Sequence, residues 1–215
     1  VEDVRGRFNH NPLAGGGQLN QPAVGALARL LASLELEERW APLIADWIDQ
    51  DPSAVFPDGG EDSLYLSQDP PYRPPNMPIT SVSELLALPG FGRERYLKLA
   101  PHVAALPADV KLNVCTASRF VLDAYKNEDE FKNVAPEDFA ERRAEACHPR
   151  VAAYEAGLPE ALRAQLRQSP GLVENSSFFR LRSIVSIGTS EFALYSPLQR
   201  DAGRVRVVMR SYSPD

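Results

Sequence analysis

The sequence predicts an α+β protein in which a mainly helical chain ends in a run of strands. Apolar residues recur at helical spacing between residues 22 and 50, and they alternate with polar residues between 177 and 210. The chain has 215 residues, 44% of them hydrophobic, which suffices for one large domain or two small ones. This composition excludes a chain that is disordered throughout.

A short strand and two amphipathic helices are predicted first. Phe8 stands between polar neighbours in residues 4–13, which favours a strand running into the glycine-rich loop 15–17. Pro22 suits a first helical turn, and leucines follow at helical spacing up to residue 36. Residues 40–48 repeat this pattern from Trp40 to Ile48. We therefore expect helices over 22–36 and 40–48.

Membrane spans need about 18 consecutive apolar residues, and no stretch of these 215 residues reaches that length. Arg29 interrupts the most apolar segment. The sequence starts at Val1 without a methionine or a signal-like stretch. We expect a targeting or anchoring segment to precede it.

The next region is acidic and then rich in proline. Residues 41–72 contain no Lys or Arg, but they hold a series of carboxylates: Asp46, Asp49, Asp51, Asp58, Glu61, Asp62 and Asp69. The prolines of residues 69–78 exclude a helix or a central strand, because proline lacks an N–H donor and fixes φ. We expect this segment to be an ordered loop packed on a surface.

More helices are predicted in the middle of the chain. Residues 82–88 and 93–104 form a helix-turn-helix pattern around Pro89-Gly90-Phe91-Gly92, with Ser81 or Ser83 as a cap. A further helix carries Phe120 and follows a cap at Asn113 or Thr116. Residues 136–157 and 159–169 also have helical patterns.

The chain ends in three predicted strands with short turns, an antiparallel meander. Phe179, Leu181, Val185 and Ile187 share one face, and Val205, Val207 and Met209 alternate with arginines. An apolar sheet face must lie on something, and a helix that precedes Val1, together with residues 22–50, is the best partner. Residues 1–50 and 175–215 would then form one domain, with residues 51–174 as an α-helical insertion.

Several kinds of catalytic or binding site find no support. There is no Gly-x-Ser-x-Gly motif, and no histidine stands in a recognisable relation to a nucleophile. Zinc ligation by Cys115, Cys147 and His148 would lack a fourth ligand. A paired-carboxylate glycosidase would need a sugar-binding aromatic platform that the pattern does not supply.

Two chemistries remain open from the residues alone. The acidic stretch places Asp49-Gln50-Asp51 and Asp58-Gly59-Gly60-Glu61-Asp62 among turn-forming residues, and Ca²⁺ takes six to eight such oxygen ligands. The spacing is not that of an EF-hand, and a solvated acidic loop is the alternative. Cys115 and Cys147 allow either one disulfide or two buried thiols.

The helix-turn-helix pattern has an alternative functional interpretation. Its glycine turn is similar to a helix-hairpin-helix motif, in which turn amides and basic residues such as Arg93, Arg95 and Lys98 hold a DNA phosphate. The formal net charge of −6, from 23 Lys and Arg against 29 Asp and Glu, weakens this interpretation. DNA binding is therefore the second hypothesis.

Taken together, a series of motifs resembles the general secretion pathway protein K family, the large minor pseudopilins of type II secretion. In chain order they are Phe8-Asn9, Asp46-Trp47-Ile48-Asp49-Gln50-Asp51, Gly60-Glu61-Asp62-Ser63-Leu64-Tyr65, Pro70-Pro71-Tyr72-Arg73, Asn76, Ser83-Glu84-Leu85, Leu106-Pro107 and Leu112-Asn113-Val114-Cys115-Thr116-Ala117. The resemblance is clear from about residue 4 to 117 and continues more weakly to the last strand.

This resemblance implies a pilin-like fold with a truncated N-terminal helix and a small antiparallel sheet, interrupted by a large all-α inserted domain. It implies a non-enzymatic periplasmic subunit, anchored in the inner membrane of a Gram-negative bacterium by the segment before Val1. Such a subunit caps the pseudopilus together with minor pseudopilins I and J, because its bulky insert allows only the tip position. The major pseudopilin, the secretin and the exported proteins are further expected partners, and nucleic acid is not.

The resemblance also implies calcium in the inserted domain near Glu61 and Asp62, to which local chemistry adds Asp51 and Asp58. Two positions depart from the family pattern: Gly60 stands where many relatives have alanine, and Cys115 where they usually have asparagine. Because the periplasm permits disulfides, the cysteine suggests a bridge from Cys115 to Cys147.

Overall fold

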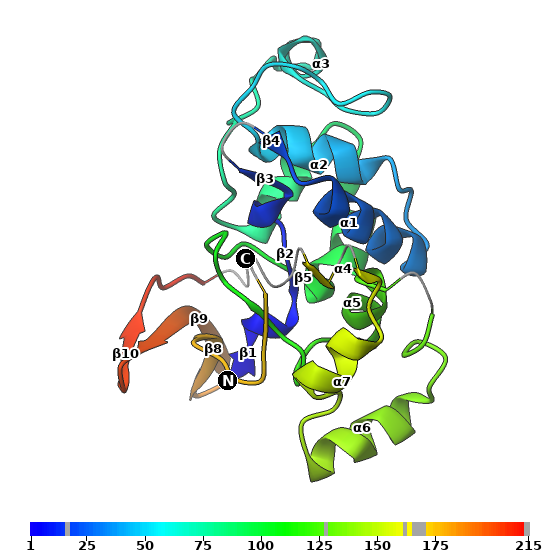
Figure 1. The fold of residues 1–215 in the computed structure, drawn as a ribbon. Coiled ribbons are helices and arrows are strands. Elements are labelled where there is room, and N and C mark those ends of the chain that lie inside the picture. The colour runs from blue at the N-terminus through cyan, green and yellow to red at the C-terminus, as the bar shows by residue number, and fades with distance from the viewer. Residues whose placement is uncertain (16–17, 127–128, 161–162, 165–170, 213–215) are drawn as a thin grey trace.

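A computed structural model describes residues 1–15, 18–126, 129–160, 163–164 and 171–212 of the chain. A helical body takes up most of the molecule, and a small sheet lies beside its lower part (Figure 1). The loop that precedes α3, and α3 itself, form the end of the body farthest from the sheet in this view. The predicted α+β mixture is confirmed.

The helices and strands are mostly short. The helices are α1 (Gln21–Ser33), α2 (Trp40–Ile48), α3 (Asp62–Leu66), α4 (Gly92–Leu99), α5 (Arg119–Ala124), α6 (Pro136–Glu145) and α7 (Val151–Ala156). The strands are β1 (Glu2–Asp3), β2 (Phe8–Asn9), β3 (Ala14–Gly15), β4 (Gln18–Leu19), β5 (Val103–Ala104), β6 (Leu112–Asn113), β7 (Leu172–Val173), β8 (Phe178–Ile187), β9 (Ser190–Asp201) and β10 (Arg204–Val207). Short 3-10 helices cover Val4–Gly6, Asn11–Leu13, Val82–Ala87 and Ala100–His102.

The core of the body forms around α1 and α2. The Asn20 side chain caps α1 by accepting a hydrogen bond from the Ala23 N–H, and Pro22 stands in the first turn, where its missing N–H costs nothing. Leu30 and Ile44 are fully buried in one cluster that also contains side chains from α4, α5 and α7. Helix α1 contacts both α2 and α5. The apolar faces of these two helices thus organise the whole helical body.

The larger sheet has the strand order β1-β8-β9-β10 and is antiparallel throughout. Val185 lies opposite Phe192, and Leu198 lies opposite both Phe179 and Val207. Residues directly opposite in an antiparallel pair point to the same side, so these side chains form one apolar face. Val185 and Phe192 remain 53% and 52% exposed. The predicted meander and its apolar face are present, and much of that face is open.

The packing of this sheet corrects one expectation. We expected residues 22–50 to lie on the apolar sheet face, but α1 and α2 are buried in the helical cluster, which contains no residue of β8, β9 or β10. From the first fifty residues, β1 joins the sheet by pairing with β8. The leucine side chains of α1 instead bury their apolar surface against α2 and α5, in the same cluster.

Other element boundaries also differ from the expectations. The strand predicted over 4–13 is divided among β2 and two 3-10 turns, and the helix over 82–88 is a 3-10 helix. The helix over 136–157 ends at Glu145 and restarts at Val151, because Pro149 interrupts it. The helix expected over 159–169 and the tip of the loop at 15–17 fall largely outside the described residues.

A disulfide and two parallel strand pairs hold distant segments together. Cys115 and Cys147 are joined by a disulfide, which ties the segment before α5 to the segment after α6. Strand β6 pairs with β7, where the chain leaves the helical body for the sheet, and β2 pairs with β5. Among the described residues, no helix combines the length and apolar character that crossing a bilayer requires.

His10 is a buried ionisable group in this framework. Its side chain has no exposed surface, and neither ring nitrogen has a hydrogen-bond partner among the described residues. Burial lowers the pKa of His10 to about 4, although the backbone at Ala104 partly offsets this effect. The folded protein therefore holds His10 neutral at pH values where the unfolded chain would protonate it.

We expect acid to destabilise the protein through His10. The pKa of His10 in the folded protein lies below the ordinary value of 6.5, so the unfolded chain binds a proton more readily. The free energy of unfolding is therefore at its full value above pH 6.5 and falls by about 3 kcal/mol in total as the pH drops towards 4. Urea unfolding between pH 7.5 and 4 measures this loss. The variant His10→Leu, which cannot bind a proton, should lose about 3 kcal/mol less over the same range. If the free energy of unfolding changed equally with pH in the two proteins, His10 would not be the cause of the acid destabilisation.

Candidate cation site

The end of α2 and the loop after it gather a group of buried carboxylates. Asp46 lies in the last turn of α2, Asp49 is the first residue after that helix, and Glu61 immediately precedes α3. Their side-chain environments are nearly closed to solvent, with exposed fractions of 0%, 3% and 6%. Buried carboxylates are unusual unless hydrogen bonds, basic side chains or a cation compensate their charge.

The backbone of the loop compensates one carboxylate oxygen of Asp46, while its Oδ1 atom has no partner among the described residues. Its Oδ2 atom accepts hydrogen bonds from the N–H groups of Val55, at 3.0 Å, and Gly60, at 2.8 Å. A 2.6 Å hydrogen bond from the Gly59 N–H to the Val55 carbonyl closes the loop between these two contacts. A Cβ atom at position 59 would overlap Asp46 Oδ2 and the Val55 backbone, so glycine is required there. Asp46 thus fastens both arms of the loop to α2.

Asp49 and Glu61 have no such compensation. Both carboxylate oxygens of Asp49 and the Oε1 atom of Glu61 lack hydrogen-bond partners among the described residues. The Asn76 Nδ2 atom lies 3.4 Å from Glu61 Oε2 and 3.5 Å from the Asp51 carbonyl oxygen, and Asn76 Oδ1 is buried without a partner. Acceptor oxygens from three chain segments therefore converge, and the Asn76 amide is the side-chain donor that reaches Glu61.

The pKa values show the electrostatic consequence. Burial raises the pKa of Asp49 to about 7, with further contributions from Asp46, Asp51 and Glu61. Burial likewise raises the pKa of Glu61 to about 7, against the opposing hydrogen bond from Asn76. The pKa of Asp46 rises to about 6 for the same main reason, although the Val55 and Gly60 N–H groups lower it. Each carboxylate disfavours ionisation of the others. A positive charge within the group would remove this repulsion.

These oxygens fit a hard divalent cation. Ca²⁺ accepts carboxylate, amide and backbone carbonyl oxygens in loose geometry, and such a cation would satisfy the unpartnered atoms and offset their mutual repulsion. In the part of the chain that the structure describes, no three His, Cys, Asp or Glu side chains are placed to hold a metal by themselves. A site here would therefore combine Asp49 and Glu61 with oxygens of Asn76 and Asp51.

The structure does not bring all four predicted calcium ligands together. Glu61 lies inside the group, and Asp51 borders it through its carbonyl oxygen, while its carboxylate accepts the Ser53 N–H at 2.8 Å. Asp58 is exposed on the loop, and Asp62 points to Arg73, 3.6 Å away. The geometry therefore favours Asp49 and Asn76 over Asp58 and Asp62. The i, i+3 spacing of Asp46 and Asp49 on an apolar helix is a sequence signal that could have selected Asp49.

The helix-turn-helix pattern does not present a free basic surface at Arg95. The Arg95 guanidinium donates to both carboxylate oxygens of Glu37, at 2.7 and 2.9 Å, and lies over the Trp40 ring. Gly90 and Gly92 both have positive φ, which joins the 3-10 helix to α4 in a sharp turn. These contacts make the motif a packed joint of the helical body.

Comparisons with known proteins identify a consistent set of relatives. Residues 6–108 match the sequence profile of the family described as type II secretion system (T2SS), protein K. The chain is 34% identical to the type II secretion system protein K of Pseudomonas aeruginosa over 98% of its own length. It is 30% identical to the proteins of the same name from Aeromonas hydrophila and Klebsiella pneumoniae, over 98% and 99% of its length.

The chain spans 63% of the length of the Pseudomonas protein and 68% of the lengths of the other two. Its fold is similar to a chain in the crystal structure of the GspK-GspI-GspJ complex from the enterotoxigenic Escherichia coli type 2 secretion system. The TM-score is 0.79 at 25% sequence identity, and the match covers 98% of this chain and 77% of that one.

We expect Gly59→Ala to destabilise the loop and the helix beneath it. The new methyl group would displace Asp46 or Val55 and break the hydrogen bonds that hold the loop, at a cost of about 2 kcal/mol or more. Gly15→Ala is the matched control, because a Cβ atom there meets nothing within 4 Å. Thermal and urea unfolding of both variants measure the difference. Equal stability of the two proteins would show that Asp46 does not clamp the loop.

Proposed function

This chain belongs to the type II secretion system protein K family, and we propose that it is a non-enzymatic structural subunit at the tip of the pseudopilus. The observation that carries the proposal is similarity along nearly the whole chain, both in sequence to protein K relatives and in fold to a chain of the GspK-GspI-GspJ complex. Assembly with minor pseudopilins I and J follows from that likeness. The subunit would start pseudopilus assembly and support export of folded proteins across the outer membrane.

The shape of the molecule supports a position at the tip. The helical body extends well beyond the sheet in Figure 1, and its far end carries the loop and α3. In a filament built from stacked sheet domains, a body of this width would collide with a subunit placed above it. The end of the filament is the position without such a neighbour.

The apolar sheet face supports packing against a helix. Ile187 is 67% exposed and Val205 is 61% exposed, alongside Val185 and Phe192 on the same face. An exposed apolar face of this kind indicates a surface that another element or protein covers in the assembled state. The proposed cover is a helix that precedes Val1, which would also anchor the subunit in the inner membrane.

The disulfide supports a periplasmic location for the helical body. Disulfides persist in oxidising compartments, including the bacterial periplasm, and are rare in the cytosol. Cys115 and Cys147 are bridged in the structure. DNA binding, the alternative, is not favoured, because the chain is acidic and Arg95 is engaged by Glu37.

Calcium is the proposed cofactor of the helical body. Asp49 and Glu61, with oxygens of Asn76 and Asp51, would hold it, and the unpartnered buried oxygens of Asp49 support this choice. The ion would supply positive charge to a buried acidic group and no catalytic chemistry. Its consequence would be a stiffer connection among α2, the loop and α3.

We expect calcium to raise the melting temperature, because it binds only the folded arrangement of these ligands. At a concentration one hundred times the dissociation constant, the shift should be about 5 °C or more relative to chelator. Terbium, a luminescent calcium substitute, should be sensitised by Tyr65, which follows Glu61 by one helical turn. Differential scanning calorimetry and terbium luminescence provide two independent measurements.

Matched variants test the ligand set. Asp49→Asn and Glu61→Gln should abolish both the melting shift and the terbium signal. Asp58→Asn should retain both, because Asp58 is exposed and outside the buried group. Identical melting curves in calcium and chelator would refute the metal site, and loss of binding in Asp58→Asn would restore the ligand set predicted from the sequence.

Assembly with I and J is tested by mixing purified soluble domains. Gel filtration with light scattering should show one heterotrimeric species when all three are present, and less complete assembly when either partner is omitted. The mass should remain that of the complex after dilution below micromolar concentration. Separate monomers at all concentrations tested would contradict the proposed function.

A further inference from the structure

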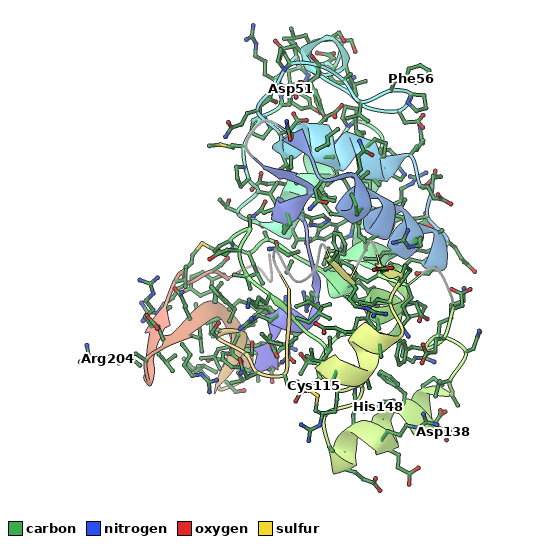
Figure 2. All side chains as sticks on the ribbon, in the orientation of Figure 1. Asp51, Phe56, Cys115, Asp138, His148 and Arg204 are labelled. Carbon is green, nitrogen blue, oxygen red and sulfur yellow. A yellow bond between two sulfur atoms is a disulfide. The ribbon has the colours of Figure 1, made fainter. Side chains whose placement is uncertain are left out.

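Phe56 is the most exposed large apolar side chain of the helical body. Its exposed fraction is 94%, compared with 46% for Leu66 on nearby α3 and 55% for Leu97 on α4. Figure 2 shows Phe56 projecting from the loop at the end of the molecule where Asp51 also lies, far from Arg204 on the sheet. An aromatic ring in this position contributes almost nothing to the core, so its position calls for another explanation.

The loop holds Phe56 in a defined position. Asp46 binds the loop on both sides of Phe56, at Val55 and Gly60, and the Gly59 N–H donates back to the Val55 carbonyl. Earlier in the loop, the Asp51 carboxylate accepts the Ser53 N–H at 2.8 Å. A side chain presented by a fastened loop loses little conformational entropy on binding, which is the property of a preorganised anchor.

The charge around Phe56 indicates what kind of surface it meets. Residues 41–72 contain no Lys or Arg, and Asp58, two positions after Phe56, is exposed. An exposed carboxylate beside an aromatic anchor complements an apolar pocket bordered by basic side chains. The same carboxylate opposes insertion into a membrane with anionic headgroups.

We propose that residues 52–58 are a docking loop, in which Phe56 enters an apolar pocket bordered by Lys or Arg on a partner protein. Asp58 contributes the charge complementarity. The inference goes beyond assembly with pseudopilins I and J, and it holds whether or not a cation occupies the site beneath the loop. The docking loop lies at the far end of the helical body from the sheet, so both surfaces can be engaged at once.

Site-specific photo-crosslinking in secreting cells tests the proposal. The full-length protein carries p-benzoylphenylalanine at position 56 or, as the matched control, at Leu97, another exposed apolar residue on a different surface. A protein crosslinked at position 56 and not at position 97 is identified by mass spectrometry. It is then purified, and its affinity for the wild-type protein is measured at low and high salt.

Three variants decide the outcome. Phe56→Ser should weaken binding about tenfold or more, Asp58→Lys should weaken it more at low than at high salt, and Leu97→Ser should leave it unchanged. Phe56→Ser should melt like wild type and still form the heterotrimer with I and J, which separates failure of docking from failure of the proposed function.

The proposal is overturned by any of four results. These are no crosslink specific to position 56, a crosslink only to a second copy of this chain, affinity that Phe56→Ser leaves unchanged, and Phe56-dependent binding to phosphatidylethanolamine-phosphatidylglycerol vesicles in place of a protein.

Discussion

The conformation of the loop between α2 and α3 depends on how the protein accommodates negative charge buried at the end of α2. Asp46, Asp49 and Glu61 are nearly inaccessible to water, and a carboxylate there is stable only when donors or cations surround it. Asp46 obtains its donors from the loop backbone, and this fastens the loop to the helix. Asp49 has no equivalent donors, and this directs the proposal of a bound calcium ion. The same acidic group thus accounts for the loop conformation, the metal proposal and the presentation of Phe56.

The molecule separates its surfaces by location. The sheet carries an apolar face that remains largely open, and the opposite end of the body carries an acidic loop with a single projecting aromatic ring. The disulfide and the pairing of β6 with β7 link distant segments in the part of the body that precedes the sheet. This arrangement suits the proposed tip position, in which one end would join the filament while the other would face outward.

Much of this architecture follows from local patterns. The apolar period from Trp40 to Ile48 predicted the helix that became α2, and the alternation after residue 177 predicted the strands, because each pattern matches a single backbone geometry. The partner of α1 was not predictable, since an apolar helix face fits a sheet or another helix equally well. For the site, motif resemblance selected Glu61, but Asp49 and Asn76 each come near Glu61 only through tertiary packing. The i, i+3 spacing from Asp46 could have selected Asp49, but no spacing rule selects Asn76 or excludes the exposed Asp58.

The sheet joins the two ends of the chain. Strand β1 pairs with β8, and Asp3 accepts a hydrogen bond from the hydroxyl of Ser176, 173 positions away. Contacts of such long range close only after the intervening chain has been made, and they slow folding because a large loop must be ordered first. The packing of α1 on α2 and α5 can therefore form before the four-stranded sheet is complete. The apolar face of the sheet is therefore complete only when residues from both of these distant segments have come together.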